Sequence, residues 1–337
     1  MLTMTTSGQG RRPTLADVAT AAGVAPSTVS RAFSRPQRVN HRTREHVLAM
    51  AARLGYVPNP TAQTLESGRT RRIALLVPDI TNPYFSGVIK GAERAAAGAG
   101  LTLVLGDTAE NATTEAELIQ RLERAVDGFV ISASRLTDDQ LRAAAERTPI
   151  ALVNRATSGL GCVVADFDTG TQQIVDHLAS FGHRSLVFVG GPAESWSGAR
   201  RWQGLQAAAG EREMEARRFG PYMPTLTGGP SAADAVLTSG ATAVVCHNDM
   251  LAIGLMRRLA ERGKSVPGDV SVVGFDNIFG ADFCHPTLTT LAERTEDAGA
   301  RAVEQVVQQV PSRQVEGPTR VLPTHLVVRA STGPVPA

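Results

Sequence analysis

The chain has 337 residues, of which 42% are hydrophobic and 20% are charged, enough for two or three domains with buried cores. No apolar run approaches the roughly 18 residues of a membrane helix, and the first ten residues lack the apolar core of a signal peptide, so we expect no contact with a membrane. The three cysteines are odd in number and far apart, which argues against a disulfide framework and favours a reducing cytoplasm.

The formal net charge of +2 is unevenly distributed along the chain. Residues 1–72 contain eleven arginines, no lysine and three acidic residues, a formal charge of +8, which leaves −6 for the remainder. A basic head on an acidic body indicates a polyanionic partner for the head alone.

Residues 15–22 predict a first helix, because apolar residues recur at steps of three and four until Gly23 ends the run. After a tight turn, Pro26 suits the first position of a second helix, in which Val29 and Phe33 supply an apolar face. Two helices joined by a glycine turn, the second with a polar outer face, are typical of a helix-turn-helix. In that motif the N-terminal part of the second helix enters the major groove of DNA.

Two further helices are predicted before the composition changes. Asn40 can cap a third helix, whose apolar period continues until Gly55 and which would close a small core over the first two. Asn59, Pro60 and Gly68 then delimit a fourth helix of only about two turns. An isolated helix needs roughly 12 to 15 residues in water, so this one should order only when something holds it.

Three blocks of this segment resemble the lac repressor and galactose repressor family of bacterial transcription regulators, and the likeness extends over nearly the whole chain. The blocks are LADVATAAGVAPSTVSRAF, TRE at 43–45 and LGYVPNPTAQTL at 54–65. The resemblance implies that the fourth helix is a hinge helix lying in the minor groove, where Leu65 matches an intercalating leucine that bends the duplex. Ala25 departs from the family, which commonly has a serine cap there, and this should weaken the second helix start by about 1 kcal/mol.

Together, the motif and the resemblance predict a set of DNA-binding residues in the head and hinge. These are Thr14, Leu15, Pro26, Ser27, Thr28, Ser30, Arg31, Arg38, Asn40, Arg42, Asn59, Ala62 and Leu65. The arginines among them suit both phosphate oxygens and guanine edges.

From residue 72 onward, seven short apolar runs alternate with segments of helix length. The runs begin at Ile73, Leu101, Gly128, Ile150, Ser185, Ala243 and Val270. Unbroken runs rich in Val, Ile and Leu indicate parallel strands buried on both faces, hence a doubly wound α/β body. Ligands in such sheets bind at the carboxyl ends of the strands, and several runs do end in polar residues.

The resemblance implies a periplasmic-binding-protein-like body of two doubly wound subdomains that face each other across a cleft. It assigns effector-binding roles to Asp79, Asn82, Phe85, Asn154, Arg155, Ser197, Arg201, Asn248 and Asp276. An arginine, a carboxylate and several amides beside an aromatic wall suit a sugar or sugar acid. Alternatives remain open, since Asp276 could cap a turn, Arg201 could form a surface ion pair and Phe85 could be core. Phe167 occupies a place where the family often has a smaller or polar residue.

The domain division expected from these patterns has four parts. They are a tail over residues 1–11, the helix-turn-helix domain over 12–58, the hinge helix and linker over 59–71, and an effector-binding and dimerisation domain over 72–337. Within the last part we expect an N-subdomain of about 72–166 plus 294–322 and a C-subdomain of about 167–293 plus 323–337.

Enzyme motifs are missing or incomplete. Gly263, Lys264 and Ser265 look like the end of a phosphate-binding loop. Such a loop requires another glycine five residues before Gly263, and this chain has Arg258 there. Neither a serine-nucleophile elbow nor a zinc-protease motif occurs, and the seven histidines are scattered. We therefore expect no enzyme activity, no cofactor and no metal.

The expected protein is a repressor of carbohydrate-related genes in the cytoplasm, associated with the nucleoid. It would bind a pseudo-palindromic double-stranded operator as a homodimer, because one head reads only a half-site. A sugar-like effector would change the spacing of the two chain exits near Arg72, and so control whether the hinge helices form. A sugar-binding module with nonspecific DNA attachment is the alternative, and an unrecognised hydrolase is a third reading. The residues do not decide the effector, the operator or the sign of the response.

Overall fold

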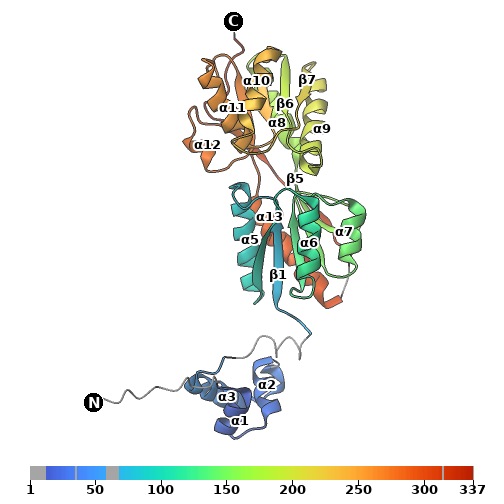
Figure 1. Cartoon of the computed structure of the whole chain (residues 1–337), viewed down its shortest axis with the longest axis vertical. Coiled ribbons are helices and arrows are strands. Elements are labelled where there is room, and N and C mark those ends of the chain that lie inside the picture. The colour runs from blue at the N-terminus through green and yellow to red at the C-terminus, as the bar shows by residue number, and fades with distance from the viewer. Residues whose placement is uncertain (1–12, 35, 58–67, 313–314, 337) are drawn as a thin grey trace, which may run out of the picture. The chain divides into compact units, whose positions relative to one another are not determined.

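The computed structural model describes residues 13–34, 36–57, 68–312 and 315–336. The chain divides into two compact units, residues 1–71 and residues 72–337 (Figure 1). The tail predicted over residues 1–11 and the predicted hinge-helix residues Asn59, Ala62 and Leu65 lie outside the described residues.

The first unit contains the three predicted helices: α1 (Leu15–Ala22), α2 (Pro26–Ser34) and α3 (His41–Leu54), with the 3-10 turn η1 (Pro36–Arg38) before α3. Gly23 and Gly55 end α1 and α3 with φ of +63° and +67°, a left-handed conformation that costs glycine little. The Asn40 side chain accepts a hydrogen bond from the amide of Arg42, so it caps α3 as predicted.

A small core holds these helices together. Val18, Val29 and Val47, one from each helix, are completely buried in it. Phe33 and Tyr56 pack at its edge with their ring centroids 5.9 Å apart. The helical period of the sequence therefore predicted both the helices and the faces that they bury.

The second unit contains two six-stranded sheets, each flanked by helices (Figure 1). The first sheet has the order β11-β5-β4-β3-β1-β2 and all its strands are parallel. Its strands are β1 (Arg72–Val77), β2 (Thr102–Asp107), β3 (Gly128–Ser132), β4 (Ile150–Val153), β5 (Gly161–Ala165) and β11 (Thr319–Leu322). One face packs on α5 (Tyr84–Gly98) and α13 (Thr295–Ser312), and the other on α6 (Ala112–Leu122) and α7 (Asp138–Ala145).

The second sheet has the order β12-β10-β9-β8-β6-β7, and only β12 in it is antiparallel to its neighbour. Its strands are β6 (Ser185–Val189), β7 (Glu215–Phe219), β8 (Ala243–Cys246), β9 (Ser271–Asp276), β10 (Thr289–Ala292) and β12 (His325–Val327). The helices α8 (Phe167–Ser180) and α9 (Trp196–Glu211) cover one face. The helices α10 (Gly229–Ser239) and α11 (Asp249–Glu261) cover the other, and the short α12 (Gly280–Phe283) follows β9.

Both sheets confirm the predicted doubly wound class, but the seven predicted runs cover only seven of these strands. The run at Leu101 became β2, an edge strand whose residues are mostly half-buried or exposed, so the expectation of burial on both faces was wrong there. The strands β5, β7, β10, β11 and β12 were not among the predicted runs. All five lie at or next to a sheet edge, where an unbroken apolar run is not required.

The helices α5 and α13 approach each other closely because both carry glycine at their contact. A Cβ atom at Gly91 would lie 1.9 Å from the carbonyl oxygen of Glu296, and one at Gly299 would lie 2.0 Å from that of Val88. Any larger residue at these positions would push the two backbones apart.

Three connections link the two sheets: β5 to α8, β10 to α13 and β11 to β12. In the first sheet the chain passes from β1 to β2 on one side and from β3 to β4 on the other. In the second sheet it passes from β6 to β7 on one side and from β8 to β9 on the other. The winding direction therefore reverses between the neighbouring strands β1 and β3, and between β6 and β8. Ligands bind outside the carboxyl ends of strands at such points. Within the described residues, no helix is both long and apolar enough to cross a membrane.

Candidate functional site

The outer face of α2 is the candidate DNA-reading surface of the first unit. Pro26, Ser27 and Arg31 are exposed, whereas Thr28 and Ser30 are half-buried. A guanidinium nitrogen of Arg31 donates to the Ser27 hydroxyl at 3.2 Å, so these two side chains lie on the same exposed face.

The other predicted head residues lie around the starts of α1 and α3. The Thr14 hydroxyl donates to the Asp17 carboxylate at 2.7 Å and accepts from the Asp17 amide, so Thr14 caps α1. Leu15 is half-buried and contributes to the core. Arg38, Asn40 and Arg42 are exposed, and they form a polar edge that continues from η1 into the first turn of α3.

A pocket lies in the second unit, at the carboxyl ends of strands from both sheets. The first sheet supplies residues that follow β1, β2, β3 and β4, and the second supplies residues that follow β6, β7 and β8 together with the last residue of β9. The lining residues are Asn82, Tyr84, Phe85, Glu110, Ala133, Arg135, Asn154, Ser195, Ser197, Arg201, Pro224, His247, Asn248 and Asp276. This is where the winding of the two sheets places a ligand site.

Seven of the nine predicted effector-binding residues line this pocket: Asn82, Phe85, Asn154, Ser197, Arg201, Asn248 and Asp276. Several also have structural roles. The Asn248 oxygen caps α11 by accepting from the Leu251 amide, while its amide nitrogen donates to the carbonyl of Pro224. Phe85 is both lining and core, since it packs in the cluster beneath α5.

The structure does not bring Arg155 and Asp79 to this lining. Asn154 has a φ of +55°, and after this left-handed residue the Arg155 side chain turns away to pair with Asp138 at 2.7 Å. Asp79 accepts from the Thr81 amide and hydroxyl, and it lines a neighbouring cavity together with Glu110 and Met223.

Arg201 is the centre of the pocket wall formed by the second sheet. Its side chain is 2% exposed, and it donates to the carboxylates of Asp276 at 3.1 Å and Glu293 at 2.8 Å. The rings of Phe275 and Phe167 lie 4.5 and 5.1 Å from its guanidinium carbon. Flanked by rings and held by two carboxylates, this arginine is fixed in place. The residue is therefore not the surface ion pair that was the alternative.

Two carboxyl groups lie next to one arginine at this wall, so ionisation of both would leave an excess of negative charge. Burial raises the pKa of Asp276 well above its usual range, with the neighbouring Glu293 acting in the same direction and Arg201 opposing it. A third carboxylate, Asp249, is completely buried at the first residue of α11, and burial raises its pKa to about 7. Asp276 has a φ of +109°, an unfavourable backbone conformation for a residue other than glycine, of the kind that occurs at functional sites.

The wall formed by the first sheet carries a second buried ion pair. Arg135 donates through Nε to the Glu110 carboxylate at 2.9 Å and through Nη1 to the carbonyl of Ala133 at 2.9 Å. The two charged side chains are only 7% and 18% exposed. This pair was not predicted from the sequence, because both residues lie in loops beyond the ends of β2 and β3.

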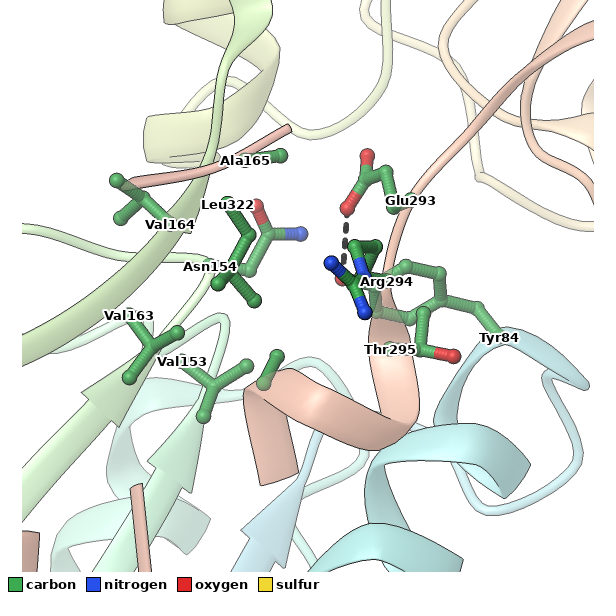
Figure 2. Close-up of a pocket in the computed structure, with 11 residues that line it drawn as sticks. Tyr84, Val153, Asn154, Val163, Val164, Ala165, Glu293, Arg294, Thr295 and Leu322 are labelled. Carbon is green, nitrogen blue, oxygen red and sulfur yellow. Dashed lines mark hydrogen bonds between the residues drawn. The ribbon is translucent and has the colours of Figure 1, made fainter. Parts of the chain in front are cut away.

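Tyr84 and Asn154 also line a small adjoining cavity together with Glu293, and this cavity is about large enough for one water molecule (Figure 2). The Tyr84 hydroxyl donates to Glu293 at 2.9 Å, which Figure 2 shows as a dashed line. Burial and the charge of Glu293 raise the pKa of Tyr84 well above its usual range, so the hydroxyl stays protonated. Tyr84 and Glu293 were not predicted: Tyr84 reads as an ordinary helix start, and Glu293 follows β10, a run that begins with two threonines.

Three buried polar atoms of the lining have no hydrogen-bond partner: Oδ1 of Asn154, Nε of Arg201 and Nδ1 of His247. His247 was not predicted as a pocket residue, although it directly precedes the predicted Asn248. Burial lowers its pKa well below the usual range, and the charges of Arg201 and Arg135 act in the same direction. The site therefore offers an arginine donor, an amide acceptor and an uncharged imidazole to a ligand.

Among the residues that the structure describes, no group of three or more His, Cys, Asp or Glu side chains is placed to hold a metal ion. Two of the histidines have structural partners, since His183 lies within 3.1 Å of the Ser271 hydroxyl and His177 within 2.8 Å of the Thr332 hydroxyl.

Two family models match the chain. Residues 14–59 match the model of bacterial regulatory proteins of the lacI family, and residues 175–332 match a periplasmic binding protein-like domain. The HTH-type transcriptional repressor CytR of Escherichia coli (strain K12) is 31% identical over 338 residues, which span 96% of this chain and 97% of that protein.

Solved structures extend the likeness to the fold of the whole chain. The lac repressor dimer bound to operator and the anti-inducer ONPF is 26% identical with a TM-score of 0.83, covering 96% of this chain and 100% of that one. The transcriptional regulator CelR in complex with cellobiose is 28% identical with a TM-score of 0.70, covering 95% of this chain and 100% of that one.

Proposed function

This chain belongs to the lacI family of bacterial regulatory proteins, and from that premise we propose that it represses carbohydrate-related genes by binding an operator under the control of a sugar-like effector. The observation that carries the proposal is the presence, in one chain, of a basic helix-turn-helix unit and a polar pocket between two α/β sheets. The similar proteins include a repressor bound to its operator and a regulator bound to cellobiose.

The proposed DNA contacts are the exposed residues of α2 and the polar edge that ends in α3. Ser27, Thr28 and Arg31 would read base edges in the major groove, while Arg38 and Arg42 would bind phosphates. Because each head spans one half-site, we propose that a homodimer binds a pseudo-palindrome. The hinge residues Asn59, Ala62 and Leu65 complete the proposed interface.

The proposed effector contacts are the seven predicted residues that line the pocket, with His247, Arg135 and Glu110 added from the structure. A hydroxyl group both donates and accepts, so neighbouring hydroxyls of one sugar could meet Nε of Arg201 and Oδ1 of Asn154. The pocket draws its residues from both sheets, so occupancy would favour one arrangement of the two halves. The domain boundaries predicted from the sequence are part of the same proposal.

Selection of sheared genomic DNA by the purified protein at about 150 mM salt, followed by sequencing, tests the DNA part of the proposal. A shared pseudo-palindrome is the expected result, and its neighbouring genes would name the sugars to titrate. Enrichment without a common site would instead favour a sugar-binding module with nonspecific DNA attachment.

A matched pair of variants sharpens this test. Arg31→Ala should weaken binding to the recovered site by about 1 to 3 kcal/mol, because a base or phosphate contact of α2 is lost. Arg53→Ala, at an exposed arginine in the last turn of α3, is the control and should bind nearly as wild type. Equal affinities of the two variants in anisotropy titrations would contradict the proposed reading face.

A further inference from the structure

The charges around the pocket lining are already paired within the protein. On the first wall, Arg135 is held by the Glu110 carboxylate. On the second wall, Arg201 is held by the carboxylates of Asp276 and Glu293. Among the described residues that line the pocket, no arginine therefore lacks a carboxylate partner.

An anionic ligand would have to displace one of these carboxylates or remain beside it. Displacement is costly because the carboxylate left behind would be a buried charge without a partner. The second wall already has more carboxylates than arginines, and Asp249 lies buried behind it. Burial raises the pKa of Asp276, and the charge of the neighbouring Glu293 raises it further, so this wall disfavours an additional negative charge.

Helix N-termini favour anions, and the starts of α5, α9 and α11 all reach this pocket. Each of these starts already has a side-chain oxygen bonded to one of its amides. Asn82 accepts from the Tyr84 amide at 3.0 Å, Ser195 accepts from the Gly198 amide at 3.1 Å, and Asn248 likewise caps α11. The donors that would hold a phosphate are thus partly occupied by the protein itself.

The polar atoms of the lining that lack a partner suit hydroxyl groups. Oδ1 of Asn154 accepts only, Nε of Arg201 donates only, and the imidazole of His247 is uncharged. We propose that the pocket takes an uncharged, polyhydroxylated ligand and discriminates against the phosphorylated or carboxylated form of the same sugar. This inference rests on the proposed function and narrows its effector class. Arg218, which is exposed near the end of β7, lies outside the lining, although its positive charge still acts on His247.

Calorimetric titration of the full chain with matched sugar pairs tests the inference. D-ribose with D-ribose 5-phosphate forms one pair, and cellobiose with cellobionate forms another. In any pair that binds, the neutral sugar should bind at least about tenfold tighter than its anion, because the anion adds an uncompensated charge to a buried site. An anion that binds as tightly as its neutral partner, or tighter, would overturn the inference.

Failure of the proposed function gives a different result. If no member of any pair bound while operator binding was intact, the sugar pocket itself would be refuted, and the inference with it. If sugars bound but no operator could be recovered, the regulatory role would fail and the charge preference would still be measured.

A variant and a matched control locate the cause of the preference. Glu110→Gln removes the carboxylate that holds Arg135, so affinity for the anionic member should rise severalfold while folding, checked by circular dichroism, is retained. Glu123→Gln breaks a similar but exposed pair with Arg147, outside the pocket, and should leave the preference unchanged. An equal effect of both variants would contradict a role for the buried pair. If Glu110→Gln failed to fold, the wild-type comparison would still decide the inference.

Discussion

The hydroxyl of Tyr84 donates a hydrogen bond to one carboxylate oxygen of Glu293 at 2.9 Å, and the other oxygen of Glu293 accepts from Arg201 at 2.8 Å. Tyr84 begins α5 beside the first sheet, Arg201 belongs to α9 beside the second, and Glu293 lies in a connection between them. One carboxylate therefore joins the two halves of the second unit at the level of the pocket.

Tyr84→Phe should lower the free energy of unfolding by about 1 to 3 kcal/mol, because Glu293 loses a donor in a buried site. Urea denaturation followed by circular dichroism measures the change. Tyr222→Phe, at a half-buried tyrosine outside the pocket lining, is the matched control and should change it little. A similar loss in both variants would mean that the bridge to Glu293 adds nothing of its own.

Arg201→Lys should weaken binding of the neutral sugar identified by titration by at least about tenfold, with operator binding by the free protein retained. Lysine keeps the charge, but it lacks the planar fork that meets both Asp276 and Glu293. Arg200→Lys is the control, since the neighbouring Arg200 pairs with Asp168 at the surface. Normal sugar binding by the Arg201 variant would refute the pocket assignment. The alanine variant is less useful, because removing one partner of a buried ion pair costs about 3 to 5 kcal/mol.

Asp249 predicts a pH dependence of stability with a definite sign. Its pKa is about 7 in the folded chain and about 4 in an unfolded one, so the folded state holds a proton that the unfolded state has released. Its contribution is fully present below about pH 4 and is lost as the pH rises through about 7, with a slope approaching 1.4 kcal/mol per pH unit, as for any single group.

Asp249→Asn tests this prediction, because asparagine does not titrate: its oxygen can accept from the Ile278 amide, and its amide nitrogen can donate to the Thr290 hydroxyl. Unfolding free energies of wild type and variant should be measured from pH 4 to 8. Relative to wild type, the variant should become more stable as the pH rises. Burial lowers the pKa values of His183 and His247, which makes the folded state more stable as the pH rises. Both proteins contain these histidines, so this opposite trend cancels in the difference between the two unfolding free energies. A difference independent of pH would contradict the assignment.

Gly91→Ala should destabilise the second unit by about 1 to 3 kcal/mol or more, because the added methyl group would collide with the backbone carbonyl of Glu296. Gly98→Ala, near the end of the same helix, is the control: nothing lies within 4 Å of the added Cβ atom. The control should be neutral or more stable by up to about 1 kcal/mol, because alanine favours the helix. Thermal melts of both variants would show whether close contact, rather than helix propensity, requires glycine at position 91.

Local patterns predicted the elements that local chemistry determines. The helices of the first unit followed from an apolar period with Gly23 and Gly55 as stops: all three begin where expected, and the first and third also end there. In the body, an interior strand such as β3 is buried along its whole length and reads as an unbroken apolar run. The edge strand β7, with the sequence EARRF, needs no such run, because solvent covers one of its sides.

The pocket was predicted where a strand end and a family motif coincide, as at Asn82 and Asp276, and Arg201 followed from the family motif alone. The partners that set its electrostatics come from long-range contacts that no local pattern encodes. Glu293 meets Arg201 across 92 positions, and Arg135 meets Glu110 across 25. The prediction that Arg155 lines the pocket was wrong for a related reason. The left-handed conformation of Asn154, the residue before it, decides which way the Arg155 side chain turns.

The connections between the sheets also affect how the chain becomes a folded protein. The helix α13, which covers one face of the first sheet, and the strand β11, which completes that sheet, are both encoded after the second sheet has all its strands but β12. During synthesis, the apolar face formed by β1, β3 and β4 must therefore wait for about the last tenth of the chain to leave the ribosome. A nascent chain arrested shortly before α13 would expose that face, and it is the stage at which this protein should depend most on chaperones.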